Sequence, residues 1–326
     1  MIDVTKFIEG KKTIIDNESN DTNTQWHILL CFDDNYALPA GVNMYSIISN
    51  NPNKKLHFHL FMQNVSNDNK CKIEQLSSNH VSITQYYLND KFKIHANNTK
   101  YFPISACLRI IAPLVIPKEV TKLLYVDSDT LCLASLDELF SLNIAGKVIA
   151  AVPDVENTQN SQCKKFQIEY GSYFNSGVLL YNLKKWNEAN ITEKALNLLN
   201  EGIAYKFPDQ DVLNILLSNN IYYLPTKYNC LTLLSVGGHE DQQKAEKGAV
   251  FIHYTSGSKP WFKLYLTSIY QNFIDGSPWY QAKLALANNL SPSTTRRYAK
   301  FLITQRKYIC AFLYYLLYLK HKLFKK

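Results

Sequence analysis

The chain of 326 residues lacks several features that mark common classes of protein. No segment reaches about 18 uncharged apolar residues, so the sequence predicts no transmembrane helix. No basic segment followed by an apolar run opens the chain, so a secretory signal peptide is not expected. The sequence contains neither G-x-x-x-x-G-K-[ST] nor G-x-G-x-x-G. If the protein binds a nucleotide diphosphate, metal and cationic groups have to hold it, with little help from a glycine cradle.

Cysteine is sparse and arginine is scarcer still. The seven cysteines are scattered, odd in number and form no C-x-x-C pair, which indicates reduced, mostly buried thiols in a cytosolic protein. The chain has only four arginines, and Arg109 is the only one before residue 296. A sequence that otherwise uses lysine favours a special role for Arg109, such as a planar fork onto phosphate or carboxylate. Chance composition is the alternative.

The net charge of +8 resides entirely in the C-terminal tail. Residues 296–326 contain nine Lys or Arg and no Asp or Glu, so removing them leaves −1 for residues 1–295. A nearly neutral body argues against a nucleic-acid-binding protein. Residues 308–319 are twelve apolar or aromatic residues between basic clusters. This stretch is too short to span a bilayer, and it predicts either a helix on an anionic membrane surface or one docked on the body.

Short apolar stretches alternate with amphipathic stretches along most of the chain. Strands are predicted at 26–32, 56–62, 81–88, 123–126, 148–152 and 250–253, and a further apolar run covers 174–183. Helices are predicted at 42–48, 71–78, 105–115, 185–200 and 210–217, with broken helical segments at 269–286. This alternation indicates an α/β fold with a mostly parallel central sheet. Residues 1–25 are expected to be an irregular arm.

The segment K-L-L-Y-V-D-S-D-T at 122–130 carries the strongest chemical signal. Asp127 and Asp129 follow a buried strand, and residues two apart in an extended chain point to the same side. Two neighbouring carboxylates repel unless something positive lies between them, and a divalent cation with oxygen ligands is the simplest candidate. The alternative is that they cap a helix or lie in a solvated turn.

Other polar groups occur where predicted strands end. His253 ends the last strand and can add an imidazole ligand, which favours Mn²⁺ or Mg²⁺ with phosphate oxygens over structural Zn²⁺. Lys259, six residues later, can reach a diphosphate, and Asp33, Asn35 and Tyr36 can hold a base and a ribose. Each of these residues also has an ordinary explanation. His253 can be a structural histidine, Lys259 a solvated lysine, and residues 33–36 a turn. The order of these residues along the chain is stronger evidence for a shared site than any one of them alone.

That order resembles the retaining glycosyltransferases of family 8, which have the GT-A (Rossmann-like nucleotide-diphospho-sugar transferase) fold, and most of all the bacterial lipopolysaccharide core glucosyl- and galactosyltransferases. The matching pieces are D-D-N-Y at 33–36, Arg109, Y-V-D-S-D at 125–129, Asp154, F-N-S-G-V-L-L-Y-N-L at 174–183, P-D-Q-D-V-L-N at 208–214 and H-Y-T-S-G-S-K-P-W at 253–261. The resemblance implies a catalytic domain at 26–275, after the arm, and a helical, basic and aromatic extension for membrane association at 276–326.

The resemblance also implies a role for each matched residue. The metal ligands are Asp127, Asp129 and His253. Uridine contacts fall to Asp33, Asn35 and Tyr36, the diphosphate contact falls to Lys259, and Ser128 lies in the same donor site. The groups that grip the donor sugar and its phosphate are Arg109, Asp154, Asn175 and Asp209. Gln210 lies beneath the anomeric carbon. One departure is Ser256, which stands where the family usually has glycine.

The implied reaction is transfer of glucose or galactose from UDP-glucose or UDP-galactose, with Mn²⁺ or Mg²⁺, onto a lipopolysaccharide core oligosaccharide in α linkage. The implied location is the cytoplasmic face of the bacterial inner membrane, held through residues 296–326. Alternative acceptors are other lipid-linked or surface glycans, and the choice between the two sugars stays open. A non-catalytic sugar-nucleotide-binding or membrane-surface protein is a further alternative. A phosphohydrolase of the haloacid dehalogenase type is disfavoured, because its D-x-D normally follows the first strand.

Overall fold

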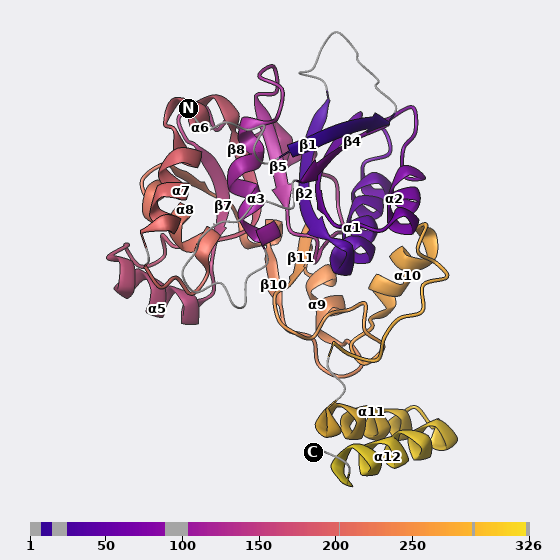
Figure 1. Cartoon of the computed structure of the whole chain (residues 1–326). Coiled ribbons are helices and arrows are strands. Elements are labelled where there is room, and N and C mark those ends of the chain that lie inside the picture. The colour runs from indigo at the N-terminus through magenta and orange to yellow at the C-terminus, as the bar shows by residue number, and fades with distance from the viewer. Residues whose placement is uncertain (1–7, 15–24, 89–103, 202, 289–290, 324–326) are drawn as a thin grey trace.

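The computed structural model describes residues 8–14, 25–88, 104–201, 203–288 and 291–323 (Figure 1). Within these ranges the chain is an α/β protein with a mostly parallel central sheet and a pair of C-terminal helices. The central sheet has the order β1-β4-β3-β2-β5-β8-β7-β9. In that order its strands are Ile8–Ile14, Val81–Leu88, Leu56–Gln63, Trp26–Asp33, Lys122–Val126, Phe174–Asn182, Ile149–Pro153 and Ile221–Tyr223.

Strand direction decides where the polar strand ends meet. Strands β4, β3, β2 and β5 run parallel to one another, as do β7 and β9, whereas β1 is antiparallel to β4 and β8 is antiparallel to both β5 and β7. In the register, Leu29 of β2 pairs with Tyr125 of β5. The carboxyl ends of β2 and β5 therefore lie at one edge of the sheet, where α/β proteins commonly bind ligands.

Helices cover both faces of the central sheet, so its inner strands are buried on both sides. On β2, Ile28 packs into the core beneath α1 and α2, whereas Leu29 packs into the core beneath α3, α7 and α8. These helices are α1 (Ala37–Asn50), α2 (Asn67–Glu74), α3 (Ile104–Ile111), α7 (Ile191–Asn200) and α8 (Pro208–Leu217). Successive strand side chains point to opposite faces, which explains the near-continuous apolar sequence of this strand.

A second, three-stranded sheet has the order β10-β11-β6. Its strands are Cys230–Thr232, Phe251–Tyr254 and Thr130–Cys132, and β11 pairs antiparallel with β6. In this pairing His253 lies opposite Thr130, and the backbone N–H of Tyr254 donates to the carbonyl of Asp129 at 3.0 Å. The small sheet thus brings a segment from more than a hundred residues along the chain beside the D-S-D turn.

Connecting elements complete the described body. They are the 3₁₀ turns η3, η4 and η5 at Asp34–Tyr36, Ala112–Leu114 and Thr226–Tyr228, and the helices α4, α5, α6, α9 and α10 at Asp137–Ser141, Glu156–Phe166, Leu183–Glu188, Glu240–Glu246 and Ser268–Gly276. All seven cysteines fall in the described ranges as free thiols, and Cys31, Cys107, Cys132 and Cys163 are buried.

Three parts of the structure correct the expectations from sequence. Residues 8–14, expected in an irregular arm, form edge strand β1, which pairs antiparallel with β4; the rest of 1–25, apart from Gln25, lies outside the described residues. The single helix expected at 185–200 is divided into α6 and α7, because Asn190 adopts a left-handed conformation with φ 51°. The expected helix at 71–78 instead runs from Asn67 to Glu74, capped by the Ser66 hydroxyl.

The C-terminal helices α11 (Pro292–Thr304) and α12 (Tyr308–Leu323) pack against each other and extend away from the body (Figure 1). Tyr298 and Tyr314 meet edge to face with ring centroids 4.7 Å apart. Phe301 lies against Gly237, where a Cβ atom would come within 2.6 Å of the ring. Within the described part of the chain, no helix has the length and apolar character needed to cross a membrane.

Candidate active site

The D-S-D turn starts where β5 ends and is held by main-chain contacts. The N–H of Asp127 donates to the carbonyl of Gly177 at 2.8 Å, and the Thr130 hydroxyl donates to the Asp127 carbonyl at 2.9 Å. Asn43 of α1 donates its side-chain amide to the carbonyls of Asp127, at 3.2 Å, and Thr130, at 2.9 Å. A buried helix side chain therefore fixes the backbone that carries both acidic residues.

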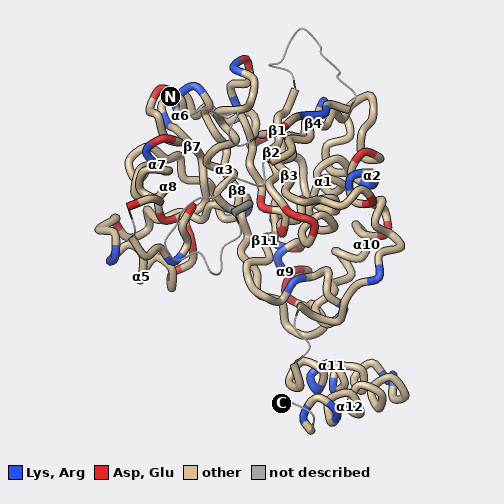
Figure 2. The backbone as a smooth tube through the Cα atoms, in the orientation of Figure 1, with Lys and Arg blue, Asp and Glu red and all other residues tan. Residues whose placement is uncertain are grey.

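The structure brings Asp127, Asp129 and His253 together. Nε2 of His253 lies 3.2 Å from Oδ1 of Asp129 and 3.7 Å from Oδ2 of Asp127. One ligand atom from each of the three residues lies within 4.8 Å of the others. Two carboxylate oxygens and one imidazole nitrogen are a donor set that suits Mn²⁺ or Mg²⁺ with phosphate oxygens. Figure 2 shows several acidic positions along the backbone near β11, at the centre of the body.

Two cations hold these carboxylates in place. Nη2 of Arg109 lies 2.8 Å from Oδ1 of Asp127, its Nε lies 3.1 Å from Oδ2 of Asp209, and Nζ of Lys259 lies 2.6 Å from Oδ2 of Asp129. The Arg109 guanidinium also lies over the Tyr125 ring, 4.4 Å from its centroid. The planar fork expected of Arg109 is thus directed at two protein carboxylates, and its contact with a donor stays a prediction.

The two acidic residues sit in different electrostatic surroundings. Burial raises the pKa of Asp127 above its ordinary value, against the opposing charge of Arg109. Burial acts on Asp129 in the same direction, but the charges of Lys259 and then His253 outweigh it and hold the pKa of Asp129 well below its usual range. Asp129 is therefore the carboxylate that stays ionised most readily.

A chain of amide hydrogen bonds sets the tautomer of His253. The backbone N–H of Gly177 donates to Oδ1 of Asn175 at 2.9 Å, and Nδ2 of Asn229 donates to the same oxygen at 2.8 Å. Oδ1 of Asn229 therefore faces Nδ1 of His253, at 2.9 Å, and accepts a hydrogen bond from its N–H. Because Nδ1 is committed to Asn229, Nε2 is the ring nitrogen that faces the two carboxylates, and it is the one that a metal ion would bind in place of a proton.

Gly177 leaves the space that this arrangement needs. A Cβ atom at position 177 would lie 2.2 Å from Cε1 and 2.6 Å from Nδ1 of His253, and 2.9 Å from Oδ2 of Asp127. These distances are far inside van der Waals contact. The glycine in the N-S-G segment of β8 is therefore required by the close approach of the imidazole.

Side chains from β7, β8 and α8 form the other wall of the site. Oδ2 of Asp154 accepts from Nε2 of Gln210 at 2.9 Å and from Nδ2 of Asn175 at 3.1 Å. Oε1 of Gln210 accepts from the backbone N–H of Ser176 at 3.0 Å, and the Ser176 hydroxyl donates to Asp209 at 3.1 Å. The side-chain oxygen of Gln210, a weak nucleophile because it belongs to an amide, is weakened further by this hydrogen bond from the main chain.

A cavity of about 610 Å³ lies between these walls. The sequence-predicted residues that line it are Arg109, Asp127, Asp129, Asp154, Asn175, Asp209, Gln210 and His253. It is bounded further out by Val155, Phe207, Leu231, Leu233, Glu240 and Lys244, which sequence reasoning did not single out. A separate apolar cavity of about 650 Å³ beside Trp186 contains none of the predicted residues, so charge rather than size identifies the site.

The remaining predicted residues lie beside this cavity rather than in its lining. Asp33 caps η3 by accepting from the N–H of Tyr36 at 3.2 Å, and Nδ2 of Asn35 lies 3.4 Å from Oδ2 of Asp33. The Tyr36 ring meets Trp261 edge-on at 5.7 Å, and Lys259 lies 5.7 Å from the centroid of Trp261. The Trp261 ring therefore lies between Tyr36 and Lys259, and Lys259 in turn contacts Asp129.

Ser128 and a set of supporting residues complete the site. Ser128 Oγ is buried and has no hydrogen-bond partner among the described residues, so it is available to a ligand. The supporting residues that sequence reasoning missed are Asn43, Tyr125, Ser176, Gly177 and Asn229. The F-N-S-G motif contained a signal for two of them. Asn229 lies in an irregular segment with no pattern that points to it.

The fold and this site define a glycosyltransferase with the GT-A fold. Residues 27–264 match the model of glycosyl transferase family 8, and residues 266–322 match its C-terminal model. The chain therefore belongs to glycosyl transferase family 8, as the motif order predicted.

Individual relatives agree with this assignment. The chain is 32% identical to lipopolysaccharide 1,2-glucosyltransferase of Escherichia coli K12 over 90% of each chain. It is 28% identical to lipopolysaccharide 1,3-galactosyltransferase of Salmonella typhimurium over 92% of each chain. The crystal structure of galactosyltransferase LgtC with donor and acceptor sugar analogues is similar in fold, with a TM-score of 0.63 and 22% identity, over 83% of this chain and 99% of LgtC.

The contact between Gly177 and His253 gives a test of the site. We expect Gly177→Ala to push the imidazole away from Asp127 and to weaken Mn²⁺ binding by about 10- to 100-fold, as loss of a group that orients a metal ligand does. Calorimetric titration with MnCl₂ measures this change. Gly146→Ala is the matched control, because a Cβ there meets nothing within 4 Å. Equal Mn²⁺ affinity in a folded Gly177→Ala protein contradicts the site geometry.

Proposed function

We propose that this glycosyltransferase is a retaining hexosyltransferase that moves glucose or galactose from a UDP-sugar onto a sugar of the lipopolysaccharide core. The convergence of Asp127, Asp129 and an Nε2-directed His253 carries the proposal, because such a set suits a metal that binds a nucleoside diphosphate. The acceptor class rests on the relatives, which include a glucosyltransferase and a galactosyltransferase named for lipopolysaccharide.

In this proposal the donor lies across the carboxyl edge of the sheet. Asp33, Asn35 and Tyr36 contact uridine, and Lys259 and the free Ser128 hydroxyl contact the diphosphate. The sugar occupies the cavity, whose lining includes Arg109, Asp154, Asn175 and Asp209. Arg109 already bridges Asp127 and Asp209, so the metal side and the sugar side of the site are rigidly connected.

Departure of UDP leaves negative charge on the diphosphate. Mn²⁺ or Mg²⁺ held by Asp127, Asp129 and His253 supplies positive charge there when bound. Lys259 adds a second positive charge from the chain itself, placed by its contact with Asp129. Asp209 lies 3.1 Å from Arg109, and this placement orients its carboxylate near the position proposed for the anomeric carbon.

Retention of configuration favours attack from the same face as the leaving group. The Gln210 oxygen accepts from the Ser176 N–H and is not basic, so Gln210 is a positioning group beneath the sugar. We infer that the departing phosphate oxygen accepts the proton of the attacking hydroxyl. A sugar trapped covalently on Asp209 overturns this route.

Family membership bears on one of the two alternatives of other classes. A haloacid dehalogenase-type phosphohydrolase is excluded by the match to family 8 over residues 27–264. A non-catalytic sugar-nucleotide-binding protein would use the same connected set of polar groups around the cavity to hold the donor. Release of UDP in the presence of an acceptor separates binding from catalysis.

We further propose that the α11–α12 hairpin holds the enzyme on an anionic membrane surface at the cytoplasmic face of the inner membrane. Ile309, Phe312, Leu316 and Leu323 are 81%, 62%, 46% and 75% exposed, and their spacing places them along one side of α12. The hairpin carries basic residues and no acidic ones in Figure 2. Exposed apolar and cationic groups on one helix pair suit an interface with anionic lipid.

Donor use tests the proposed reaction. We expect the wild-type protein with Mn²⁺ to release UDP from UDP-glucose or UDP-galactose in the presence of truncated core oligosaccharide. We expect Asp129→Ala to lower kcat/KM at least about 100-fold, because positioning of the diphosphate depends on this carboxylate. Asp137→Ala, which changes an exposed acidic residue, is the matched control. Wild-type turnover by Asp129→Ala rejects the metal assignment.

Vesicle binding tests the role of the hairpin. We expect Ile309→Ser/Phe312→Ser to lose sedimentation with phosphatidylglycerol vesicles while keeping activity on a soluble acceptor, because both side chains lie far from the cavity. Deleting residues 296–326 is expected to do the same. Tyr280→Ser, which removes another exposed aromatic ring from the body, serves as the control. If the double variant and the deletion variant both sediment with the vesicles as the wild-type protein does, the proposed membrane contact of the hairpin is refuted.

A further inference from the structure

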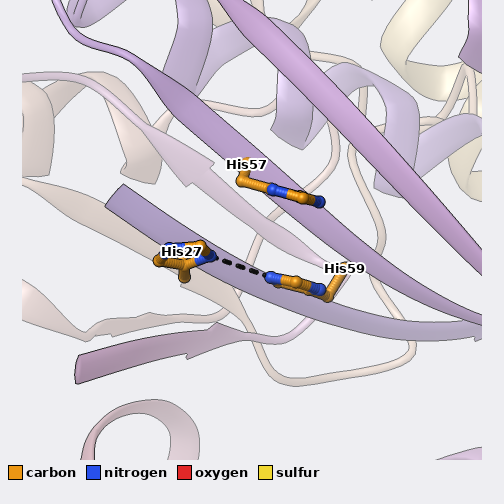
Figure 3. A group of neighbouring side chains, drawn as sticks. All are labelled: His27, His57 and His59. Carbon is orange, nitrogen blue, oxygen red and sulfur yellow. Dashed lines mark hydrogen bonds between the residues drawn. The ribbon is translucent and has the colours of Figure 1, made fainter. Parts of the chain in front are cut away.

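Three histidines gather on one face of the central sheet, at the end of the strands opposite the active site. His27 is the second residue of β2, which ends at Asp33, and His57 and His59 lie near the start of β3. In the parallel register His27 pairs with His57, and His59 is two residues further along the same face. Figure 3 shows the three imidazoles side by side above these strands.

The rings are in direct contact. Nδ1 of His27 lies 3.0 Å from Nε2 of His59, and the rings of His57 and His59 stack with centroids 4.3 Å apart. One ring nitrogen from each of the three histidines lies within 4.8 Å of the others. His27 and His59 are buried, and His57 is the least buried of the three.

Two hydroxyl groups on the adjoining strand β4 hold the outer nitrogens. Nδ1 of His59 lies 3.2 Å from the Tyr86 hydroxyl, and Nε2 of His57 lies 2.8 Å from Oγ1 of Thr84. Each contact leaves the other nitrogen of the ring for a second partner. Histidines that bind metals are commonly held in this way, with one nitrogen on the metal and the other hydrogen-bonded to a neighbour.

Two of the three imidazoles, those of His57 and His59, are neutral at physiological pH. Burial lowers the pKa of His57 to about 4, and burial together with the neighbouring imidazoles lowers the pKa of His59 well below its ordinary value. The positive charge of Lys11 acts on His59 in the same direction. Neither ring therefore carries a second proton, and the proton that a metal ion has to displace is the one in the hydrogen bond between Nδ1 of His27 and Nε2 of His59.

We propose that His27, His57 and His59 form a zinc-binding site that joins β2 to β3. Three imidazoles without a carboxylate are a nitrogen-only set, which suits Zn²⁺ and differs in kind from the oxygen-rich set of Asp127, Asp129 and His253. Two histidines at i and i+2 of one strand and a third on the next strand present their nitrogens on one sheet face. The fourth position is left to water.

Binding requires a change of tautomer at the contact between His27 and His59, and one local movement. In the stack the lone pairs of His57 and His59 lie in nearly parallel planes, 5° apart, so they do not converge on one point. Rotation of the His57 ring about its Cβ–Cγ bond gives up the contact with Thr84 and turns a ring nitrogen toward the facing pair of His27 and His59. The lower burial of His57 makes it the ring that moves, and the stack is the metal-free arrangement.

Titration of the full chain with Co²⁺ tests the site, because tetrahedral Co²⁺ absorbs visible light and replaces Zn²⁺. The parent protein carries Asp129→Ala and His253→Ala, which remove two of the three donors at the active site. We expect the EDTA-treated parent to bind one Co²⁺ with a tetrahedral spectrum and to bind Zn²⁺ in competition with a chromogenic chelator. His57→Ala and His59→Ala in this parent are expected to weaken binding at least about 100-fold.

His80→Ala is the matched control, because His80 is exposed and outside the cluster, and we expect it to bind Co²⁺ as the parent does. Circular dichroism in EDTA verifies that each variant is folded, and His57→Ala carries the test if His59→Ala does not fold. Unchanged affinity in His57→Ala, or a parent that gives no tetrahedral spectrum, overturns the proposal. Either result leaves the proposed transfer reaction untouched, because that reaction uses the opposite edge of the sheet.

Discussion

Charge balance between Asp127 and Asp129 is the constraint on which the active site depends. Two carboxylates in a buried turn repel each other, and desolvation penalises both. One cation contacts each carboxylate, Arg109 that of Asp127 and Lys259 that of Asp129, and the imidazole of His253 lies between them. These partners come from a helix before the turn and from a loop more than a hundred residues after it, so the whole fold takes part in holding the pair.

Rigid hydrogen bonding transmits this constraint to the sugar side of the site. Asn175 is the shared member: its oxygen sets the orientation of Asn229, and its amide nitrogen donates to Asp154. The main-chain N–H groups of Gly177 and Ser176 fix Asn175 and Gln210 in turn. Backbone donors cannot flip, so the donor and acceptor atoms facing the cavity are determined by the path of β8. A site that is set before a ligand arrives loses little free energy to ordering.

The sequence predicted those parts of the site that follow from local pattern. A buried strand followed by two acidic residues is visible at 122–130, and the scarcity of arginine drew attention to Arg109. The residues that required long-range pairing were not visible. The β6–β11 register that brings His253 beside Asp129 joins short strands far apart in the sequence, and Asn229 lies in an irregular segment. Strand β1 was missed because a polar edge strand lacks an apolar pattern, and the division between α6 and α7 depends on the backbone conformation of Asn190.

Anomalous diffraction at the manganese absorption edge, from crystals grown with Mn²⁺ and UDP, tests the central claim most directly. The account predicts one anomalous peak in contact with a carboxylate oxygen of Asp127, a carboxylate oxygen of Asp129 and Nε2 of His253, with UDP phosphate oxygens completing the coordination. A peak at any other place, or bound UDP without a metal among these three residues, contradicts the account.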